Sequence, residues 1–298
     1  MAAKQCPDRY YDRMKSSGDD KLKITKFLSD GDSVLDVGAG GGVLAELLLE
    51  TFPSMTVTAL DPSNTATARL HALAGKFPGR LSVVQTDFFA FESEEKFDAV
   101  VFCSSLHEIF SYTEYEGKRY EKAVVSLALD HAAQLLKSHS GKIIVRDGVA
   151  ARHNPKVMLQ YIDKGMKDLA ERYENEFTGF PLKITHTMFG DIMPYNSMME
   201  LLYTITWGEE SFAREVQEWY GYYSLDDWRT EEKRLAIKFG LFLTCAEKYL
   251  QSGYKEHLNG KVILRSAPLM DWDGNLNSKL LELPASNCIV VFERGRCV

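Results

Sequence analysis

The chemistry of this chain is centred on a glycine-rich turn that follows an apolar strand with an acidic residue. The stretch Val34-Leu-Asp-Val-Gly-Ala-Gly-Gly-Gly42 places Asp36 near the end of the predicted strand 33–38, and Gly38, Ala39, Gly40 and Gly42 in the turn that leads into a predicted helix over 42–52. Glycine tolerates positive φ and leaves room for a ligand to approach the backbone. The following helix start offers free N–H groups. The third glycine comes one residue earlier than in the dinucleotide fingerprint G-x-G-x-x-G. This turn therefore predicts a nucleotide-like cofactor other than NAD.

Carboxylates follow two later predicted strands. The strand 56–60 is followed by Asp61 and Pro62, and the strand 81–85 by Asp87 and Phe88. An ionised carboxylate carries two acceptor oxygens, which suits a pair of ribose hydroxyls. Asp61 lies 25 residues beyond Asp36. Structural alternatives stay open, because a glycine turn also serves as a tight strand-to-helix connection and Asp36 can fix that turn by accepting backbone hydrogen bonds.

Taken together, these segments resemble the cofactor-binding half of class I S-adenosylmethionine-dependent methyltransferases. The resemblance covers about 24–148 and resumes near 224–294. It implies that Asp61 accepts hydrogen bonds from the ribose, that Asp87 accepts one from the adenine amino group, and that Phe88 forms an apolar wall for the adenine ring. For Asp36 it leaves two roles open, a direct contact with the methionine amino group or fixing the turn. The cofactor would be S-adenosyl-L-methionine, with S-adenosyl-L-homocysteine as product. A lid helix before the first strand would bring Tyr11 over the cofactor.

Alternating strands and helices predict an α/β fold, a doubly wound, seven-stranded, mostly parallel Rossmann-like sheet with right-handed crossovers. Further strands are expected at 98–103, 141–147, 241–247 and 287–293, and helices at 8–29, 64–76, 119–138 and 224–239. We divide the chain into a lid helix and cofactor-binding core at 1–149, a helical, aromatic-rich cap inserted after the fifth strand at 150–223, and the remainder of the core at 224–298. We assign no role to 249–286.

The ends of the fourth and fifth strands carry the candidate catalytic groups. Ser104, His107 and Glu108 follow the fourth strand, and Arg146 ends the fifth. In an open α/β sheet, ligands bind outside the carboxyl ends of the strands. We expect Ser104 to contact the cofactor, His107 to act as a general base beside Glu108, and Arg146 to meet a substrate carboxylate. The alternatives are a packing role for His107 and an internal Arg146–Asp147 pair.

The cap predicts the substrate class. It holds eleven Asp and Glu residues against seven Lys and Arg, whereas nucleic-acid binders are usually basic. Nucleic acid is therefore disfavoured, and we expect a small-molecule acceptor. Four side chains of the cap are the candidate substrate contacts, namely Tyr195, Asn196, Trp207 and Tyr222.

The composition predicts a cytoplasmic enzyme. The chain has 298 residues and a formal net charge of −7 at pH 7. Its five cysteines are scattered without a C-x-x-C pair, so no metal site is predicted. No signal peptide or membrane span is expected, and a homo-oligomer is compatible with the sequence. The predicted activity is methyl transfer to an O, N or C atom of a small molecule. The alternatives are an RNA or protein methyltransferase, and a non-catalytic S-adenosylmethionine-binding protein.

Overall fold

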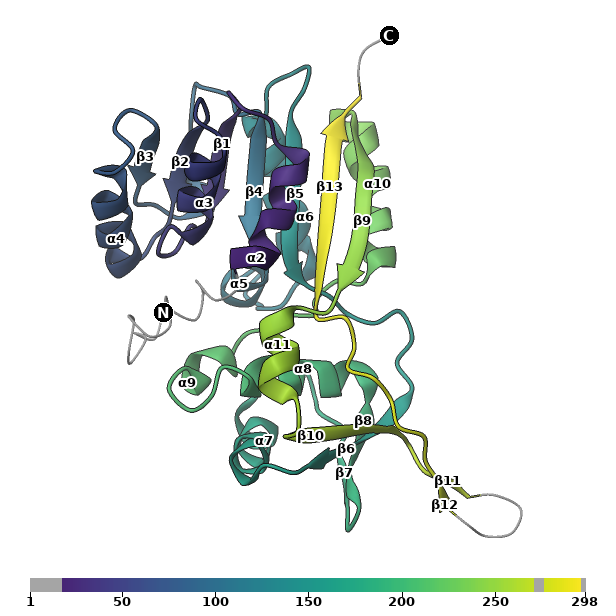
Figure 1. Ribbon diagram of the computed structural model, residues 1–298. Helices are drawn as coiled ribbons and strands as arrows, with labels where there is room; N and C mark the ends of the chain where they lie inside the picture. Colours follow the sequence, from purple (N-terminus) through teal and green to yellow (C-terminus); the bar gives the residue numbers. More distant parts are fainter. Residues whose placement is uncertain (1–17, 271–275, 296–298) are drawn as a thin grey trace.

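The computed structural model describes residues 18–270 and 276–295. The chain forms two units, drawn one above the other in Figure 1. The upper unit is a seven-stranded sheet with helices on both faces, which we call the core. The lower unit is smaller, contains its own four-stranded sheet, and lies opposite one end of the core strands, and we call it the cap. None of the helices in the described ranges is long and apolar enough to cross a membrane.

The core sheet has the strand order β3-β2-β1-β4-β5-β13-β9. Its strands are β1 (Ser33–Val37), β2 (Thr56–Leu60), β3 (Leu81–Val84), β4 (Ala99–Cys103), β5 (Lys142–Gly148), β9 (Leu241–Tyr249) and β13 (Asn287–Arg294). Only β13 runs against its neighbours, pairing antiparallel with both β5 and β9. The strand order reverses between β1 and β4, and ligands bind at such a switch point in open α/β sheets.

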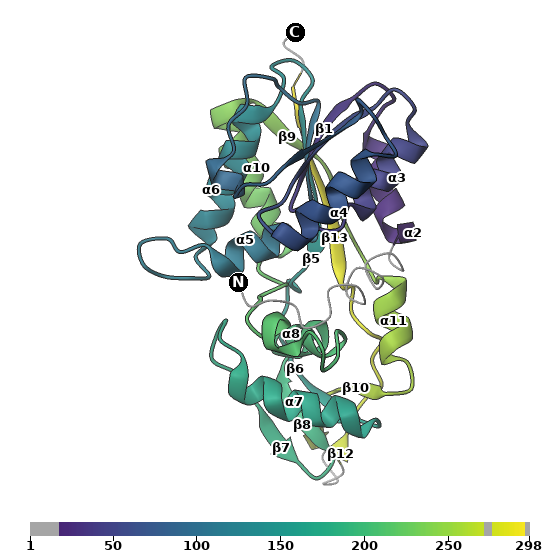
Figure 2. The ribbon, with the colours of Figure 1, turned by 90° about the vertical axis from the view of Figure 1, so that its left-hand side faces the viewer.

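Two layers of helices cover the sheet, as the side view in Figure 2 shows. One layer holds α2 (Gly18–Lys21), the 3-10 helix η1 (Leu22–Phe27), α3 (Val43–Thr51) and α4 (Asn64–Ala74). The other holds the short η2 (Phe88–Ala90), α5 (Leu106–Tyr112), α6 (Lys122–Leu135) and α10 (Leu225–Phe239).

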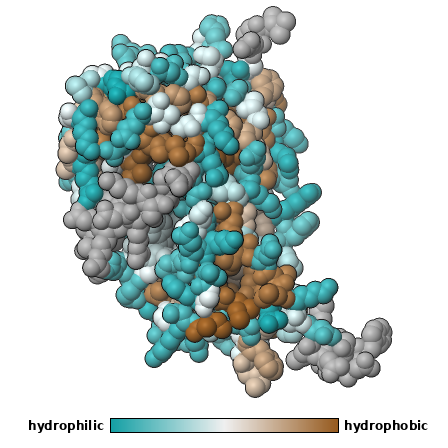
Figure 3. All heavy atoms as spheres, in the orientation of Figure 1, coloured by the Kyte–Doolittle hydropathy of each residue, from teal (hydrophilic) through white to brown (hydrophobic). Residues whose placement is uncertain are grey.

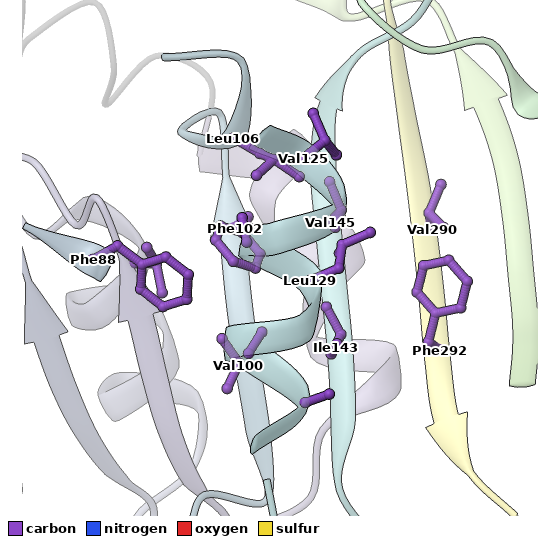
Figure 4. Packing of buried hydrophobic residues seen from close by; sticks show 14 of the residues in the cluster. Phe88, Val100, Phe102, Leu106, Val125, Leu129, Ile143, Val145, Val290 and Phe292 are labelled. Carbon is purple, nitrogen blue, oxygen red and sulfur yellow. The ribbon is translucent and has the colours of Figure 1, made fainter. Parts of the chain in front are cut away.

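Apolar residues at helical spacing explain why these helices bury one face. In Figure 4, Val125 and Leu129 of α6 lie over the side chains that β4 and β5 present to this layer. Helix α10 begins with a capping box, in which Ser224 and Asp227 satisfy each other's backbone N–H groups, and ends at Gly240 in the left-handed conformation. The sequence thus specifies both the face that α10 buries and its two ends.

The cap packs around a separate hydrophobic cluster. It contains β6 (Lys156–Tyr161), α7 (Lys164–Glu176), β7 (Thr185–Thr187), β8 (Gly190–Pro194), α8 (Tyr195–Ile205), α9 (Phe212–Glu215), α11 (Ser252–Leu258) and β10 (Val262–Ser266). The cap sheet is antiparallel with the order β10-β6-β8-β7. A two-stranded ribbon of β11 (Leu269–Met270) and β12 (Leu276–Asn277) follows. In Figure 3 the described surface of one face is largely hydrophilic, with hydrophobic side chains gathered in one area on each unit.

The core confirms the predicted sheet and every predicted core strand. Of the predicted helix 8–29, the structure describes α2 and η1, and residues 8–17 lie outside the described residues. The cap corrects two expectations. It is not only helical, because it has its own sheet, and it extends beyond 150–223, because α11 and β10 come from the segment assigned to the core at 224–298.

Candidate functional site

The glycine turn adopts a conformation that excludes side chains. Gly38, Gly40 and Gly42 have φ values of 68°, 56° and 84°, which L-residues rarely adopt. A Cβ atom on Gly38 would lie 2.6 Å from the Cβ of Ser105. The Gly38 and Ala39 N–H groups donate to the Leu60 carbonyl at 2.8 and 3.0 Å. The turn is therefore held close to β2 and to the start of α5, and its three glycines carry no side chain that would block a ligand.

Asp61 fixes the other side of this turn. Its Oδ2 accepts the Gly40 N–H at 2.8 Å, and its Oδ1 accepts the Ser63 N–H at 2.8 Å. Pro62 lies between the two contacts. Each carboxylate oxygen can accept a second hydrogen bond. Asp61 is thus placed both to shape the turn and to accept hydroxyl donors from a ribose.

Asp36 is almost fully buried at the end of β1. Burial raises its pKa to about 7, although the Lys21 ammonium opposes this rise. Within the described part of the chain, its Oδ2 has no hydrogen-bond partner. The predicted alternative, in which Asp36 fixes the turn by accepting backbone hydrogen bonds, is not what the structure shows. A buried acceptor without a donor is costly, so this oxygen suits a cationic ligand group.

The turn after β3 presents Asp87 and buries Phe88. Asp87 is exposed, and its Oδ1 accepts the Phe89 N–H at 2.9 Å. Phe88 instead packs edge-to-face against Phe102, with ring centroids 5.3 Å apart, and against His131. Asp87 is therefore available to a ligand. Phe88 supports this turn from inside the core, and the half-buried Phe89 is the ring left nearer the surface.

The ends of β4 and β5 are joined through Ser104 and Arg146. Ser104 has a φ of 58°, and its N–H donates to the Arg146 carbonyl at 2.7 Å. The Arg146 guanidinium donates from Nη1 to Ser104 Oγ at 2.6 Å and from Nε to Tyr249 Oη at 3.0 Å. The alternative internal pair of Arg146 with Asp147 is not formed, because Asp147 bonds to His107. Among residues 18–270 and 276–295, no group partners Arg146 Nη2.

His107 is enclosed by two carboxylates. Its Nδ1 lies 2.6 Å from Asp147 Oδ1, and its Nε2 lies 3.4 Å from Glu218 Oε2. Its ring stacks on Tyr220 at 4.5 Å between centroids. Burial alone would lower the pKa of His107, but Asp147 and Glu218 raise it well above its ordinary value. The two carboxylates therefore favour the charged imidazolium, which must lose its proton before it can act as a general base.

Glu108 belongs to the same network. Arg214 pairs with Glu108 and, through Nε at 2.9 Å, with Glu218 Oε1. Burial would raise the pKa of Glu218, yet the hydrogen bond from His107 and the charge of Arg214 hold it far below its usual value. His107, Glu108 and Glu218 also have the spacing of a metal site. Since the Arg214 guanidinium already supplies the positive charge there, we assign no metal to them.

A cavity of about 250 Å³ lies where these groups meet the cap. The core contributes Ser104, His107, Arg146 and Asp147 from the ends of β4 and β5. Those strand ends point toward the cap in Figure 1. The cap closes the cavity with residues of α8, α9 and α11 and the segments beside them. Its aromatic lining consists of Tyr203, Trp207, Tyr220 and Tyr254.

The structure separates the four predicted substrate contacts. Trp207 lines the cavity. Tyr222 is buried behind it and donates to Asp147 Oδ2 at 3.3 Å. Tyr195 lines a different cavity of about 280 Å³ beside the connections between the two units. Asn196 accepts the Ala151 N–H at 2.9 Å, which is a structural contact. Tyr11 lies outside the described residues.

Several residues of the cavity were not predicted from the sequence. Glu218 and Tyr220 contact His107 from more than 100 positions away in the chain. Tyr203 donates its hydroxyl to the Ser286 carbonyl at 2.6 Å and so joins α8 to the start of β13. In the sequence, only the acidic and aromatic composition of 150–223 pointed to these residues. This composition does not indicate which side chains face the cavity.

Comparison with known proteins identifies one domain within the core. Residues 34–118 match the family model described as a methyltransferase domain. This part of the chain is a methyltransferase domain. The match includes the glycine turn, Asp61, Asp87 and His107, and the strand order around it is the Rossmann-like sheet described above. The cofactor of this domain class is S-adenosylmethionine, and the three glycines of the turn and the oxygen of Asp36 that has no partner among the described residues fit it.

Curated relatives align with the methyltransferase domain over part of their length. The tRNA1(Val) (adenine(37)-N6)-methyltransferase of Vibrio campbellii is 30% identical over 40% of this chain and 49% of its own. The ribosomal RNA small subunit methyltransferase G of Pseudomonas aeruginosa is 34% identical over 33% of this chain and 47% of its own. The chain thus spans about half the length of these relatives.

Solved structures align over most of the chain at low identity. The YcgJ protein of Bacillus subtilis is 14% identical and covers 94% of this chain and 98% of its own, with a TM-score of 0.48. The plantazolicin methyltransferase BpumL in complex with SAH is 10% identical and covers 96% and 85%, with a TM-score of 0.48. We take the fold from the strand order itself.

Proposed function

We propose that this protein transfers a methyl group from S-adenosylmethionine to an O, N or C atom of a small molecule held in the cavity between core and cap. The observation that carries the proposal is the position of this cavity. It lies outside the ends of β4 and β5, beside the switch point where the glycine turn is found. A donor on the turn and an acceptor in the cavity would be neighbours.

The residues of the core are suited to hold the donor. Asp61 offers two acceptor oxygens for ribose hydroxyls, and Asp87 offers an exposed acceptor for an adenine amino group. When bound, S-adenosylmethionine supplies an activated methyl group on a sulfonium. The task of the protein is then to position the acceptor, and correct positioning alone lowers the barrier by several kcal/mol.

The proposed role of His107 follows from its charge. Held as an imidazolium between Asp147 and Glu218, it fixes the start of α5 and the wall of the cavity, and it presents a positive charge to the acceptor. It accepts a proton from the acceptor only in its neutral form, which is populated above its raised pKa. Glu108 supports this arrangement through Arg214.

The dimensions and charge of the cavity favour a small acceptor. Its volume of about 250 Å³ lies just below the roughly 300–1,000 Å³ of most ligand pockets, and the cap that encloses it carries more acidic than basic residues. RNA is the alternative acceptor, because the named relatives act on tRNA and ribosomal RNA. An RNA acceptor would require a nucleotide to enter this cavity against the acidic surface of the cap.

The test is a methyl-transfer assay with the purified protein. S-adenosylmethionine labelled in its methyl group is supplied with a library of small hydroxyl, amine and carbon acceptors and, in parallel, with total tRNA and ribosomal RNA. We expect saturable label transfer to a small molecule and release of S-adenosylhomocysteine. Transfer to RNA alone would refute the small-molecule proposal. Binding of S-adenosylmethionine with no transfer to any acceptor would favour a non-catalytic binding protein.

A further inference from the structure

The hydroxyl of Tyr220 lies at the wall of the cavity between two buried carboxylates. It donates to Glu215 Oε2, and Glu218 Oε2 lies 3.1 Å away. All three residues line the cavity between core and cap. Glu215 and Glu218 are each 1% exposed. A phenol is both a donor and an acceptor, so its oxygen can receive a proton from the cavity while its own proton passes to a carboxylate.

Packing and hydrogen bonds fix Tyr220 in place. Its ring stacks on His107 at 4.5 Å between centroids, and its centroid lies 5.5 Å from that of Tyr203. Its backbone N–H donates to Glu200 Oε2 at 2.9 Å. A Cβ atom on Gly148 would lie 2.5 Å from the Tyr220 carbonyl oxygen, so this residue packs directly on the end of β5. Tyr220 is therefore held at the edge of the core sheet where ligands bind.

Of the two carboxylates at this hydroxyl, Glu218 is poorly suited to take up a proton. Its Oε1 accepts a hydrogen bond from Arg214 Nε at 2.9 Å, and its Oε2 lies 3.4 Å from His107 Nε2. Although burial would raise the pKa of Glu218, the hydrogen bond from His107 and the charge of Arg214 hold it far below its usual value. Glu218 therefore stays ionised, and Glu215 is the better proton acceptor.

We propose that Tyr220 and Glu215 form a proton relay that deprotonates an acceptor hydroxyl group during methyl transfer. The acceptor proton moves to Tyr220 Oη, and the proton of that phenol moves to Glu215 Oε2. The acceptor oxygen bonds to the methyl carbon as the carbon–sulfur bond of the donor breaks, which leaves an ether, a neutral thioether and a protonated Glu215. The proton returns through Tyr220 to solvent after the methylated product leaves.

This inference rests on the proposed function and narrows it to a hydroxyl acceptor. It also supplies the base that His107 cannot be in its charged form. Asp147 and Glu218 favour this imidazolium, whose ring lies against that of Tyr220. A neighbouring positive charge stabilises negative charge that develops on the phenol oxygen while a proton passes through it. His107 is then a positioning residue, and Tyr220 is the group that touches the acceptor.

A second tyrosine–glutamate pair of the same protein provides a matched control. Tyr223 donates to Glu231 Oε1 at 2.9 Å, and both side chains are buried. Neither belongs to the described residues that line the cavity. Tyr220→Phe and Glu215→Gln remove the proton path and keep most of the side-chain volume. Tyr223→Phe and Glu231→Gln make the same changes away from the cavity.

Steady-state kinetics with the hydroxyl acceptor found in the methyl-transfer assay test the relay. Tyr220→Phe and Glu215→Gln should each lower kcat by at least about 100-fold and leave the KM for the acceptor nearly unchanged, because a general base contributes roughly 10²–10⁴-fold. The double variant should be no slower than the slower single variant, since the two residues act as one unit. Both control variants should keep the wild-type kcat.

Calorimetric titration with S-adenosylhomocysteine shows whether the same preparations are folded. All four single variants should bind it as the wild type does, so a lower kcat cannot be attributed to unfolding. If both relay variants keep the wild-type kcat, or if only KM changes, the relay is wrong while the proposed function stands. If the wild type methylates only amine or carbon acceptors, the relay again fails alone. If it methylates no small molecule, both proposals fail.

Discussion

Replacing Gly38 by alanine tests how closely the glycine turn packs on the core. Gly38 has a φ of 68°, and an added Cβ would lie 2.6 Å from the Cβ of Ser105. The left-handed conformation costs an L-residue roughly 1–2 kcal/mol. Forcing a methyl group into a packed site adds about 1–3 kcal/mol. Ser105 has little room to yield, because its Oγ donates to the Val37 carbonyl at 2.5 Å. We expect Gly38→Ala to lower the free energy of unfolding by about 2–5 kcal/mol.

Gly240→Ala is the control variant. It separates the cost of the left-handed conformation from the cost of crowding Ser105. Gly240 has a φ of 64°, close to that of Gly38, but no atom lies within 4 Å of its added Cβ. Urea unfolding of both variants should therefore show that Gly38→Ala is less stable by about 1–3 kcal/mol, the cost of the crowding alone. Equal losses in the two variants would refute the reasoning, because they would show that the turn does not rest on Ser105.

Three further predictions concern the site. Gly40→Val should abolish S-adenosylhomocysteine binding in calorimetry without unfolding the protein, and normal affinity would place the ligand elsewhere. His107→Ala should leave that binding intact and reduce turnover in the methyl-transfer assay, and unchanged turnover would remove His107 from the catalytic site. Burial raises the pKa of Glu200 to about 8, so between about pH 5 and 8 the folded protein holds a proton that the unfolded chain has released. The free energy of unfolding should fall as the pH rises through this range, and Glu200→Gln should flatten the fall, so an unchanged slope would contradict this assignment.

The core could be predicted because its signals are local. β4 is a continuous apolar run, and β1 is apolar except for Ser33 and Asp36. Residues of the site follow directly on strand ends, as Gly38 follows β1 and Asp61 follows β2. Parallel strands bring those ends to one edge of the sheet without any further information. The sequence alone therefore predicted the individual candidate residues for cofactor binding.

The cap could not be predicted in the same way. Its strands are short or irregular, and all three residues of β7 are exposed, so no alternation marks it. The partners of His107 are fixed by tertiary packing, with Asp147 40 residues away and Glu218 in another unit. The sequence suggested His107 as a base because it shows the imidazole but not the two carboxylates that raise its pKa.

The place of β13 in the sheet has a consequence for synthesis of the chain. This strand is translated after every other described element, yet it lies between β5 and β9. Until it leaves the ribosome, β9 has no neighbour in the sheet, and one edge of β5 stays unpaired with its backbone groups exposed. Unpaired edges recruit other chains. The nascent protein therefore passes through a stage that is prone to aggregation, and that stage ends only when β13 inserts and closes the sheet.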